Sequence, residues 1–323
     1  MRKVMMPQFC CFVAFLVVSL LAMWTPDVMA QQRSETPQVG KYPGGHVGLR
    51  GGYSPPGGEL GVFNFNRYYI AGNLKNASGD TIRPAGVSTY TNITGAEYVS
   101  EYKVFGMNWG GLIAVPFNTV NEHPNSPGSE SSGMGLGDIV FAPFWFFGKS
   151  DHFDYQVGAG VWAPSGSFSP GSHDNHGSGF WEAIYSLGGV YYPDGNRKSF
   201  SISAVTRIEQ NFTQRHTDVH VGDDVIMDWG ISGPLLAFGD KFKHVFDIGV
   251  SGFATTQFTR ETGANAALNT KLYRVFATGP EIRYTLPAWK MNLLFRPQWE
   301  YMARNTTQGM TYWVALVYNF GHI

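Results

Sequence analysis

Residues 289–301 read WKMNLLFRPQWEY. Their odd positions are apolar or aromatic, whereas the even positions, with the exception of Leu294, are polar or charged. Because successive side chains of a strand point to opposite faces, this period of two predicts one long strand between an apolar medium and a polar one. Strands of soluble proteins are usually about five or six residues long. Thirteen residues with aromatic side chains near both ends therefore favour a strand that crosses a bilayer.

The first thirty residues are typical of an export signal. Arg2 and Lys3 precede an apolar run over residues 9–23, and small residues lead up to Ala30. The run is shorter than the roughly 20 residues that a spanning helix needs, so we predict a signal peptide over residues 1–30, with a retained anchor as the alternative. Both cysteines, at positions 10 and 11, lie inside this segment. The mature chain would then have neither disulfides nor thiolate chemistry.

The composition is unusual for a protein that is surrounded by water. Charged residues make up 15% of the chain and aromatic residues another 15%, whereas charged residues are about 25% of a typical soluble protein. The formal net charge is −1 and no basic run is present, which excludes nucleic acid as an expected partner. No stretch after Ala30 reaches eighteen apolar residues. A membrane protein without helical spans is a closed barrel, because lipid offers no hydrogen-bonding partner for a free strand edge.

The chain beyond the signal divides into two parts. Residues 31–57 are rich in Gly, Pro and Gln, and we predict a flexible periplasmic lead-in there. Residues 58–323 are predicted to form an outer-membrane β-barrel. The candidate strands are 58–70, 89–105, 107–120, 137–148, 152–164, 180–192, 198–213, 223–238, 243–259, 271–286, 289–303 and 311–320.

The lengths of the connections add an independent signal. Short links, such as 149–151 and 287–288, alternate with long polar ones at 71–88, 165–179 and 304–310. Outer-membrane barrels have short periplasmic turns, long external loops and an even number of strands. We therefore predict an all-β fold, a transmembrane antiparallel up-and-down β-barrel of about 12 strands in the outer membrane of a Gram-negative cell. A soluble β-sandwich also has alternating strands, but it explains neither the strand lengths nor this rhythm.

Ionisable side chains on the strands are expected to face the lumen. A basic group facing lipid at the bilayer midplane costs about 2–4 kcal/mol, and an acidic one somewhat less. Mixed signs favour salt bridges that brace the wall over a filter that selects one ionic sign. A small ligand can occupy such a lumen unless side chains or residues 31–57 fill it. The candidates are Glu182, Arg207, Glu209, Asp228, Asp247, Arg296 and Glu300.

Two clusters of histidine and aspartate fall in predicted external loops. Imidazole and carboxylate groups are metal ligands, but neither cluster brings a fixed fourth ligand, so we interpret both as solvated polar loops. We expect no metal, no cofactor, no catalytic residue and no enzymatic activity. The clusters are His173, Asp174 and His176, and His216, Asp218 and His220.

Several motifs between residues 135 and 232 resemble a known family. They are GLGD at 135–138, APSG at 163–166, NHGSGFW at 175–181, YY at 191–192, and VGDD at 221–224 followed by DWG at 228–230. Together they resemble the outer-membrane proteins named for the meta-pathway of phenol degradation, over roughly residues 45–320. The resemblance implies an outer-membrane β-barrel that acts as a channel for hydrophobic or aromatic compounds. The motifs themselves have structural explanations, since Pro164, for example, ends a strand.

These observations predict an outer-membrane channel for the passive uptake of small hydrophobic or aromatic compounds. Ligand contacts are expected in external loops, at Phe168, His173 and Phe180. The expected partners are outer-membrane lipid, such small molecules and the barrel-assembly machinery, whose terminal aromatic signal Phe320 matches. The alternative is a non-conducting structural or adhesive barrel, and an outer-membrane hydrolase is a third possibility.

Overall fold

The computed structural model describes residues 40–122, 133–172, 174–239, 243–266 and 271–322. The predicted signal peptide lies outside these residues. Within the described part of the chain, no helix is long and apolar enough to cross a bilayer.

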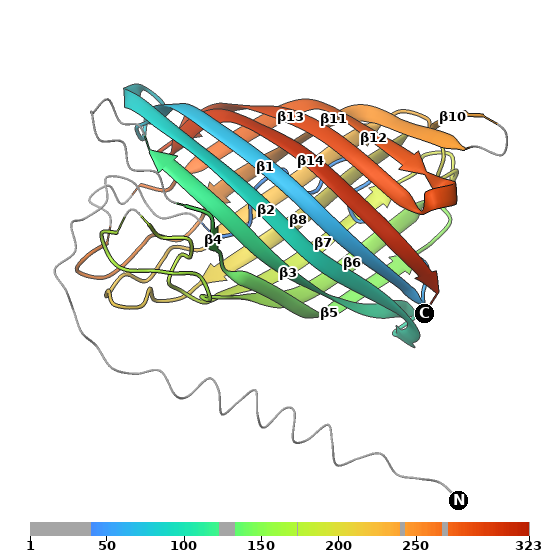
Figure 1. The fold of residues 1–323 in the computed structure, drawn as a ribbon, viewed down its shortest axis with the longest axis horizontal. Helices are drawn as coiled ribbons and strands as arrows, with labels where there is room; N and C mark the ends of the chain where they lie inside the picture. The colour runs from blue at the N-terminus through green and yellow to red at the C-terminus, as the bar shows by residue number, and fades with distance from the viewer. Residues whose placement is uncertain (1–39, 123–132, 173, 240–242, 267–270, 323) are drawn as a thin grey trace, which may run out of the picture.

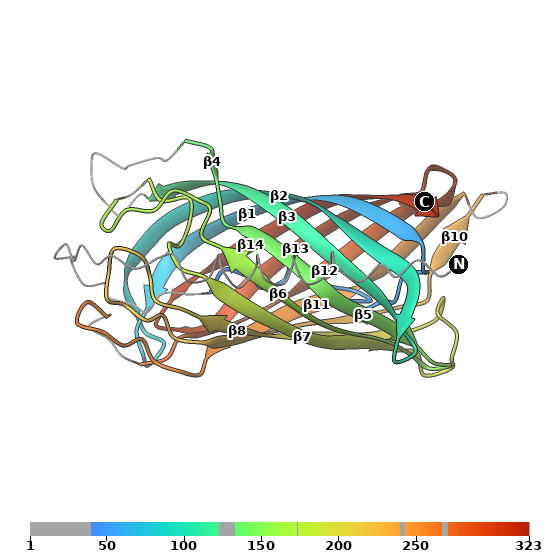
Figure 2. The same cartoon turned by 90° about the horizontal axis from the view of Figure 1, so that it is seen from below.

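Twelve long strands make the wall of a closed barrel (Figures 1 and 2). They are β1 (Glu59–Lys75), β2 (Thr81–Val104), β3 (Met107–Glu122), β5 (Ile139–Lys149), β6 (Phe153–Ala163), β7 (Glu182–Tyr191), β8 (Ser201–Asn211), β9 (Asp224–Ser232), β11 (His244–Gln257), β12 (Arg274–Leu286), β13 (Met291–Arg304) and β14 (Thr307–His322). Two short strands, β4 (Gly135–Leu136) and β10 (Leu236–Phe238), pair with β3 and β11, and a 3-10 turn at Pro287–Trp289 joins β12 to β13.

Each wall strand pairs antiparallel with its neighbours along the chain, and β1 pairs with β14 to close the ring. In the closing register Phe65 lies opposite Ala315. The predicted all-β, up-and-down barrel of 12 strands is thus confirmed. The candidate strand 223–238 is divided into two strands. Gly233 and Pro234 end β9, which pairs with β11, and the short β10 then pairs with the next part of β11.

The strand over residues 289–301 has the two faces that its alternation predicts. Phe295 and Trp299 are each 46% exposed on the outside of the barrel, whereas Arg296 and Gln298 are fully buried inside it. The strand itself begins at Met291. Trp289 belongs instead to the 3-10 turn, and Lys290 leaves that turn in the left-handed region at φ 53°.

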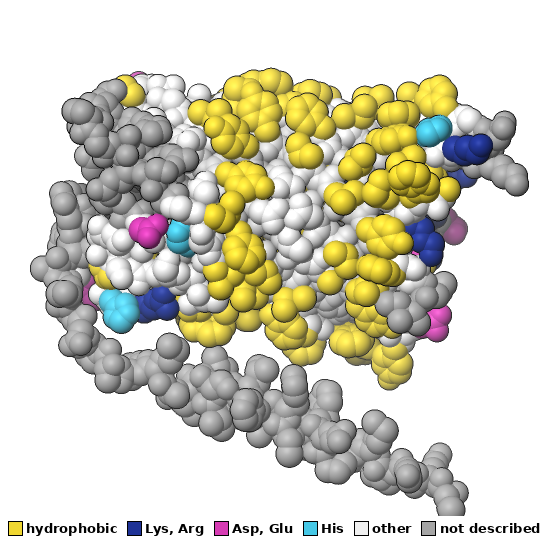
Figure 3. All heavy atoms as spheres, in the orientation of Figure 1, with side chains coloured by type: hydrophobic (Ala, Val, Ile, Leu, Met, Phe, Trp, Pro, Cys, Tyr) yellow, Lys and Arg dark blue, Asp and Glu magenta, His cyan; other side chains and the backbone are white. Residues whose placement is uncertain are grey.

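Large apolar side chains are exposed on the outer face of the barrel, where they form yellow bands in Figure 3. Exposed apolar groups on a closed barrel with no free strand edge require a lipid solvent. The chain is therefore an outer-membrane β-barrel. Figure 1 shows long loops at one end of the barrel and the C-terminus at the other, as expected for external and periplasmic ends.

Two of the expected long loops are shorter than predicted. Strands β1 and β2 extend through most of residues 71–88 and leave only residues 76–80 between them. Likewise, only Asn305 and Thr306 separate β13 from β14. Polar residues at these strand ends are paired in the sheet, as in Asn73 opposite Gln308, so polarity alone did not mark the ends of the strands.

Candidate functional site in the barrel lumen

Residues 40–57 lie inside the barrel, where the blue trace of Figures 1 and 2 runs between the walls. The acceptors for their backbone N–H groups are inward carboxylates of β7, β8, β9 and β12. Gly40 donates to Asp224 (3.0 Å), Lys41 to Glu182 (2.9 Å), Tyr42 to Glu209 (2.9 Å), Gly45 and Val47 to Asp228 (2.7 and 3.1 Å) and Leu49 to Glu281 (3.0 Å). We call residues 40–57 the lumenal segment.

The lumenal segment differs from the flexible periplasmic lead-in that we expected over residues 31–57. Residues 31–39 lie outside the described residues. Residues 40–57 have little apolar periodicity because their interactions are mostly backbone hydrogen bonds, which leave no pattern in the sequence. The acceptors are carboxylates, and charge-assisted hydrogen bonds are about twice as strong as neutral ones.

Two cations of the lumenal segment pair with the wall. The Lys41 ammonium lies 3.0 Å from the Asp138 carboxylate and 4.7 Å from the centre of the Phe180 ring. The Arg50 guanidinium lies 2.8 Å from Asp247 and also donates to the Ser199 carbonyl. Lys41 and Arg50 therefore hold the segment at two separate points.

Two arginines of the wall reach the same segment. Arg207 of β8 lies 3.4 Å from Asp228, and its guanidinium covers the Tyr42 ring at 4.1 Å. Arg296 of β13 donates to the Gly45 carbonyl. Gly45 has φ 80°, and a Cβ at this position would overlap the Gln298 amide. Glycine is therefore required here both by the backbone conformation and by the close approach.

Six of the seven predicted lumen-facing residues lie in this network. Glu182, Glu209 and Asp228 accept backbone hydrogen bonds from the lumenal segment. Arg207, Asp247 and Arg296 contact its side chains or carbonyls, as described above. Glu300 lies apart, half-buried, where it accepts hydrogen bonds from the Tyr69 hydroxyl (3.0 Å) and the Gly309 N–H (2.7 Å).

Sequence reasoning missed three carboxylates of the site. Asp224 and Glu281 accept hydrogen bonds from the lumenal segment, and Asp138 pairs with Lys41. Asp224 is four residues before Asp228 and shares its face on β9, so parity could have found it. Glu281 shares the inner face of its strand in the same way. Asp138 precedes β5 and ends the GLGD motif at 135–138, but nothing in that motif indicates a partner in the lumen.

The predicted contacts in the external loops have different outcomes. Phe180 is only 1% exposed and packs with Val219 and Val221, so it is not an exposed loop contact. The reason is that Lys41 of the lumenal segment covers one face of its ring. Phe168 is half-buried against Gly179, and His173 lies outside the described residues.

The histidine and aspartate clusters organise loops. His176 Nδ1 lies 2.9 Å from Asn118 Oδ1, and the Asp218 carboxylate accepts the Asn265 N–H at 2.9 Å. Desolvation raises the pKa of the half-buried Asp218, but hydrogen bonds from backbone N–H groups outweigh it and lower the pKa overall. Among the described residues, no group of three or more His, Cys, Asp and Glu side chains could hold a metal ion.

The ionisable side chains of the lumenal segment are strongly affected by burial. Burial lowers the pKa of His46 to about 3, and the Arg207 and Arg296 charges act in the same direction. His46 is therefore neutral at neutral pH. Burial also lowers the pKa of Lys41, while Asp138 and Glu182 oppose this shift, and it raises the pKa of Tyr42.

The opposite side of the lumen is apolar and aromatic. Its side chains come from β1, β2, β3, β5, β6, β7 and β14. It meets the carboxylate side at β6 and β7, where Trp162 lies opposite Glu182. We call this cluster the aromatic wall. It comprises Ile93, Val99, Ala114, Val140, Ala142, Trp145, Phe147, Trp162, Ile184 and Trp313, with Phe63 and Phe65 packed against it.

The lumenal segment meets the aromatic wall at Tyr42, which packs against it, and at His46. The His46 ring centre lies 4.3 Å from that of Phe65 and 5.3 Å from that of Trp313. A neutral imidazole packs against aromatic rings without the desolvation cost of a charge. The lumen thus has a charged side, which binds the segment, and an aromatic side, which contacts the segment through the rings of Tyr42 and His46.

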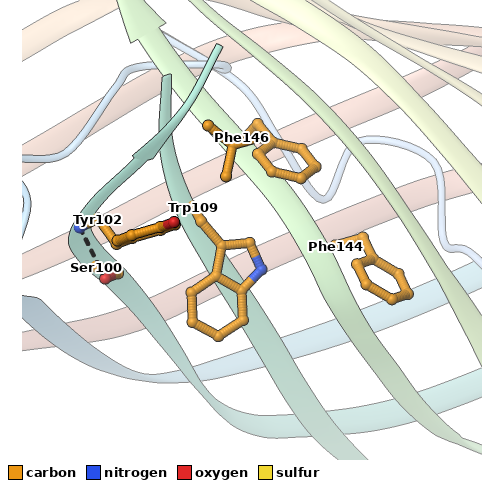
Figure 4. A pocket seen from close by; sticks show the side chains of 6 residues that line it. Ser100, Tyr102, Trp109, Phe144 and Phe146 are labelled. Carbon is orange, nitrogen blue, oxygen red and sulfur yellow. Dashed lines mark hydrogen bonds between the residues drawn. The ribbon is translucent and has the colours of Figure 1, made fainter. Parts of the chain in front are cut away.

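A second feature lies on the outer wall. A recess of about 420 Å³ is formed there by side chains of β2, β3 and β5 (Figure 4). The Trp109 indole N–H donates to the Pro143 carbonyl (2.9 Å), where the β5 register shifts. Because the recess opens on the lipid side, an acyl chain or an apolar compound can fill it. Its lining residues are Ser100, Tyr102, Val104, Trp109, Phe144 and Phe146.

A closed barrel of 12 wall strands, apolar outside and occupied inside by its own N-terminal segment, defines a class of outer-membrane β-barrel protein. The family model described as "Putative MetA-pathway of phenol degradation" matches residues 71–316, so the chain belongs to this family. The resemblance found in the sequence motifs is thus confirmed.

The structure of one solved outer-membrane channel supports the same fold. An outer-membrane channel from Pseudomonas putida F1 superposes with a TM-score of 0.69 at 11% identity, covering 83% of this chain and 98% of that one. The β domain of a Bordetella autotransporter gives a TM-score of 0.49 at 10% identity, covering 82% of this chain and 100% of that one. Comparison with curated protein sequences gives no match.

Proposed function

We propose that this protein is an outer-membrane channel through which small hydrophobic or aromatic compounds enter by passive diffusion. The aromatic wall is the observation that carries this proposal. Aromatic rings attract one another at centre distances of about 4.5–7 Å, so a wall of such rings suits an aromatic solute better than a sugar or an ion. Membership of a family described by phenol degradation supports the same class of cargo.

The proposed route runs between the aromatic wall and the lumenal segment. His46 contacts Phe65 and Trp313 across this route, and a solute passes there when the segment shifts. No covalent step is involved. This motion is feasible because the described part of the lumenal segment is held to the wall by hydrogen bonds and ion pairs, which can break and re-form.

Uptake measurements test the route. Cells that lack the protein are complemented with the wild type or with Trp313→Ala, and the entry of labelled phenol and toluene is followed. We expect the variant to restore less aromatic uptake than the wild type. Leu187→Ala, which shortens an exposed side chain on the outside of β7, is the matched control and should restore full uptake. Equal uptake by the deletion strain and its parent would remove the basis of the proposal.

Conductance distinguishes this function from the alternatives. A non-conducting structural or adhesive barrel would give no single-channel steps in planar bilayers and no change on addition of phenol. A hydrolase would show turnover that a Ser or His substitution abolishes without unfolding the barrel. We also propose the barrel-assembly machinery as a partner in insertion, through β14, where Phe320 is 50% exposed two residues after Tyr318.

A further inference from the structure

A cluster of polar side chains lies on the outer face of β1 and β2. Phe63 and Phe65 of β1 face inward and pack with Trp313. Because side chains alternate along a strand, Asn64 and Asn66 face lipid. Opposite them in the register, β2 places Thr94 and Asn92 on the same face. We call this set the amide patch. It comprises Asn64, Asn66, Tyr90, Asn92 and Thr94.

Asn64, Asn66, Asn92 and Thr94 of the amide patch lie within the apolar belt, and Tyr90 lies at one edge of the belt, opposite Tyr68. In the registers of β1 with β14 and with β2, the amide patch is flanked on one side by Tyr68 and Tyr312, and on the other by Tyr98 and Tyr318. All four of these aromatic side chains are on the outer face, as expected for the girdles at the two membrane interfaces. Figure 3 shows white atoms between two yellow bands on the face that carries these strands.

Hydrogen bonds within the patch satisfy most of its groups. Asn64 Nδ2 donates to Thr94 Oγ1 (2.7 Å), and Asn66 Nδ2 donates to Asn64 Oδ1 (2.7 Å). Asn66 Oδ1 accepts from the Tyr90 hydroxyl (2.6 Å) and from Asn92 Nδ2 (2.8 Å). These bonds explain how amides are tolerated on a lipid-facing wall, where an unsatisfied polar group is costly.

The amide patch has both a donor and an acceptor with hydrogen-bonding capacity left over. Within the described residues, Asn92 uses one of its two N–H donors, and Asn64 Oδ1 accepts one of the two hydrogen bonds that an amide oxygen can accept. Acyl chains can satisfy neither group. Lipid headgroups lie at the girdles and do not reach this depth. A partner that brings polar groups to the middle of the membrane is therefore a protein.

We propose that the amide patch is the surface through which two copies of this chain associate in the membrane. A patch that carries donors and acceptors together is complementary to itself, which is the requirement of a two-fold interface. Its neighbours on β2, Ser88 and Ala96, are small, and small residues allow the backbones of membrane proteins to approach closely. This proposal is independent of the cargo.

Cross-linking in native outer membranes tests the proposal without removing any amide. In the full-length protein, Thr94→Cys should give a disulfide-linked dimer on mild oxidation. Leu187→Cys, at a 66% exposed position on β7 across the barrel, is the matched control and should give no dimer above the wild-type background. Dimer formation by Leu187→Cys alone, or by neither variant, would overturn the proposal.

A second variant measures the contribution of the amides. Asn64→Leu, Asn66→Leu and Asn92→Leu are combined, and dimerisation is measured by energy transfer between labelled copies in vesicles. Membrane hydrogen bonds between such groups are worth about 1–2 kcal/mol in model peptides, so the dissociation constant should rise at least about tenfold. Apolar side chains suit the lipid face, so the barrel should fold, as heat-shifted electrophoretic mobility reports. An unchanged dissociation constant, or a wild type that stays monomeric at high protein-to-lipid ratios, would contradict the proposal.

Discussion

Arg296 of β13 and Glu281 of β12 form an ion pair inside the barrel, with 2.7 Å between Arg296 Nε and Glu281 Oε2. Both side chains are fully buried, and each also binds the lumenal segment, Arg296 through the Gly45 carbonyl and Glu281 through the Leu49 N–H. The pair therefore joins two neighbouring strands of the wall to the segment that occupies the lumen. Arg283, 2.6 Å from Glu281 Oε1, is the second cation at this carboxylate.

Loss of one member of this pair should destabilise the barrel strongly. Removing one partner of a buried ion pair costs about 3–5 kcal/mol, because it leaves the other charge without compensation. We expect Arg296→Met to lower the free energy of unfolding, measured by urea titration in detergent, by an amount near the low end of this range, since Arg283 remains. The double variant Arg296→Met with Glu281→Gln should recover part of the loss. Equal losses in the single and double variants would show that charge is not the cause.

Deletion of residues 40–57 should open the lumen and make it prefer cations. The deletion removes Lys41 and Arg50, along with the backbone N–H groups that donate to the lumenal carboxylates. Deletion should raise single-channel conductance, and the reversal potential in a KCl gradient should have the sign of cation selectivity. Arg50→Gln alone, which keeps the segment in place, is the control. An anion-selective deletion variant would contradict this charge assignment. The acidic side chains left on the inner face would include Glu182, Glu209, Asp224, Asp228, Asp247, Glu281 and Glu300, against the basic Arg67, Arg207, Arg283 and Arg296.

Acid should release the lumenal segment through His46. The pKa of this histidine falls from its ordinary value of 6.5 to about 3 when it is buried in the lumen, chiefly by desolvation. The released segment therefore binds a proton below about pH 6.5 while the seated one does not. Seating is fully favoured above that pH and is weakened as the pH falls toward 3, by on the order of 3 kcal/mol at pH 4.

The measurement is single-channel conductance between pH 7 and pH 4. Openings should become more frequent in the wild type as the pH falls. His46→Phe keeps the ring contacts with Phe65 and Trp313 but cannot be protonated, so its conductance should lose most of this pH dependence. The same pH dependence in both proteins would assign it to the wall carboxylates instead.

Gly45→Ala should displace part of the lumenal segment. Alanine at φ 80° is strained by roughly 1–2 kcal/mol, and its Cβ would also overlap the Gln298 amide. Gly171 has a similar φ of 75°, but a Cβ there meets nothing within 4 Å, so Gly171→Ala separates backbone strain from the lumenal contact. We expect higher conductance and faster proteolysis of the segment only in Gly45→Ala. Identical behaviour of the two variants would contradict the close approach.

Much of the barrel was predictable from local patterns. The alternation of residues 289–301 assigned Phe295 and Trp299 to lipid and Arg296 to the lumen, because the period of a strand depends only on its own backbone. The ends of the strands were less predictable. Residues 81–88 were expected in a loop yet belong to β2, because pairing with β1 continues beyond the apolar belt.

The sequence by itself determined that this chain is an outer-membrane barrel of 12 wall strands, and which side chains face inward, since parity and lipid exposure are local properties. Only the tertiary structure decided what the inward carboxylates bind. Gly40 meets Asp224 and Leu49 meets Glu281 across separations of 184 and 232 residues. Such contacts exist only once the ring has closed around the lumenal segment. Their donors are backbone N–H groups, which every residue except proline carries, so no residue pattern could have announced them.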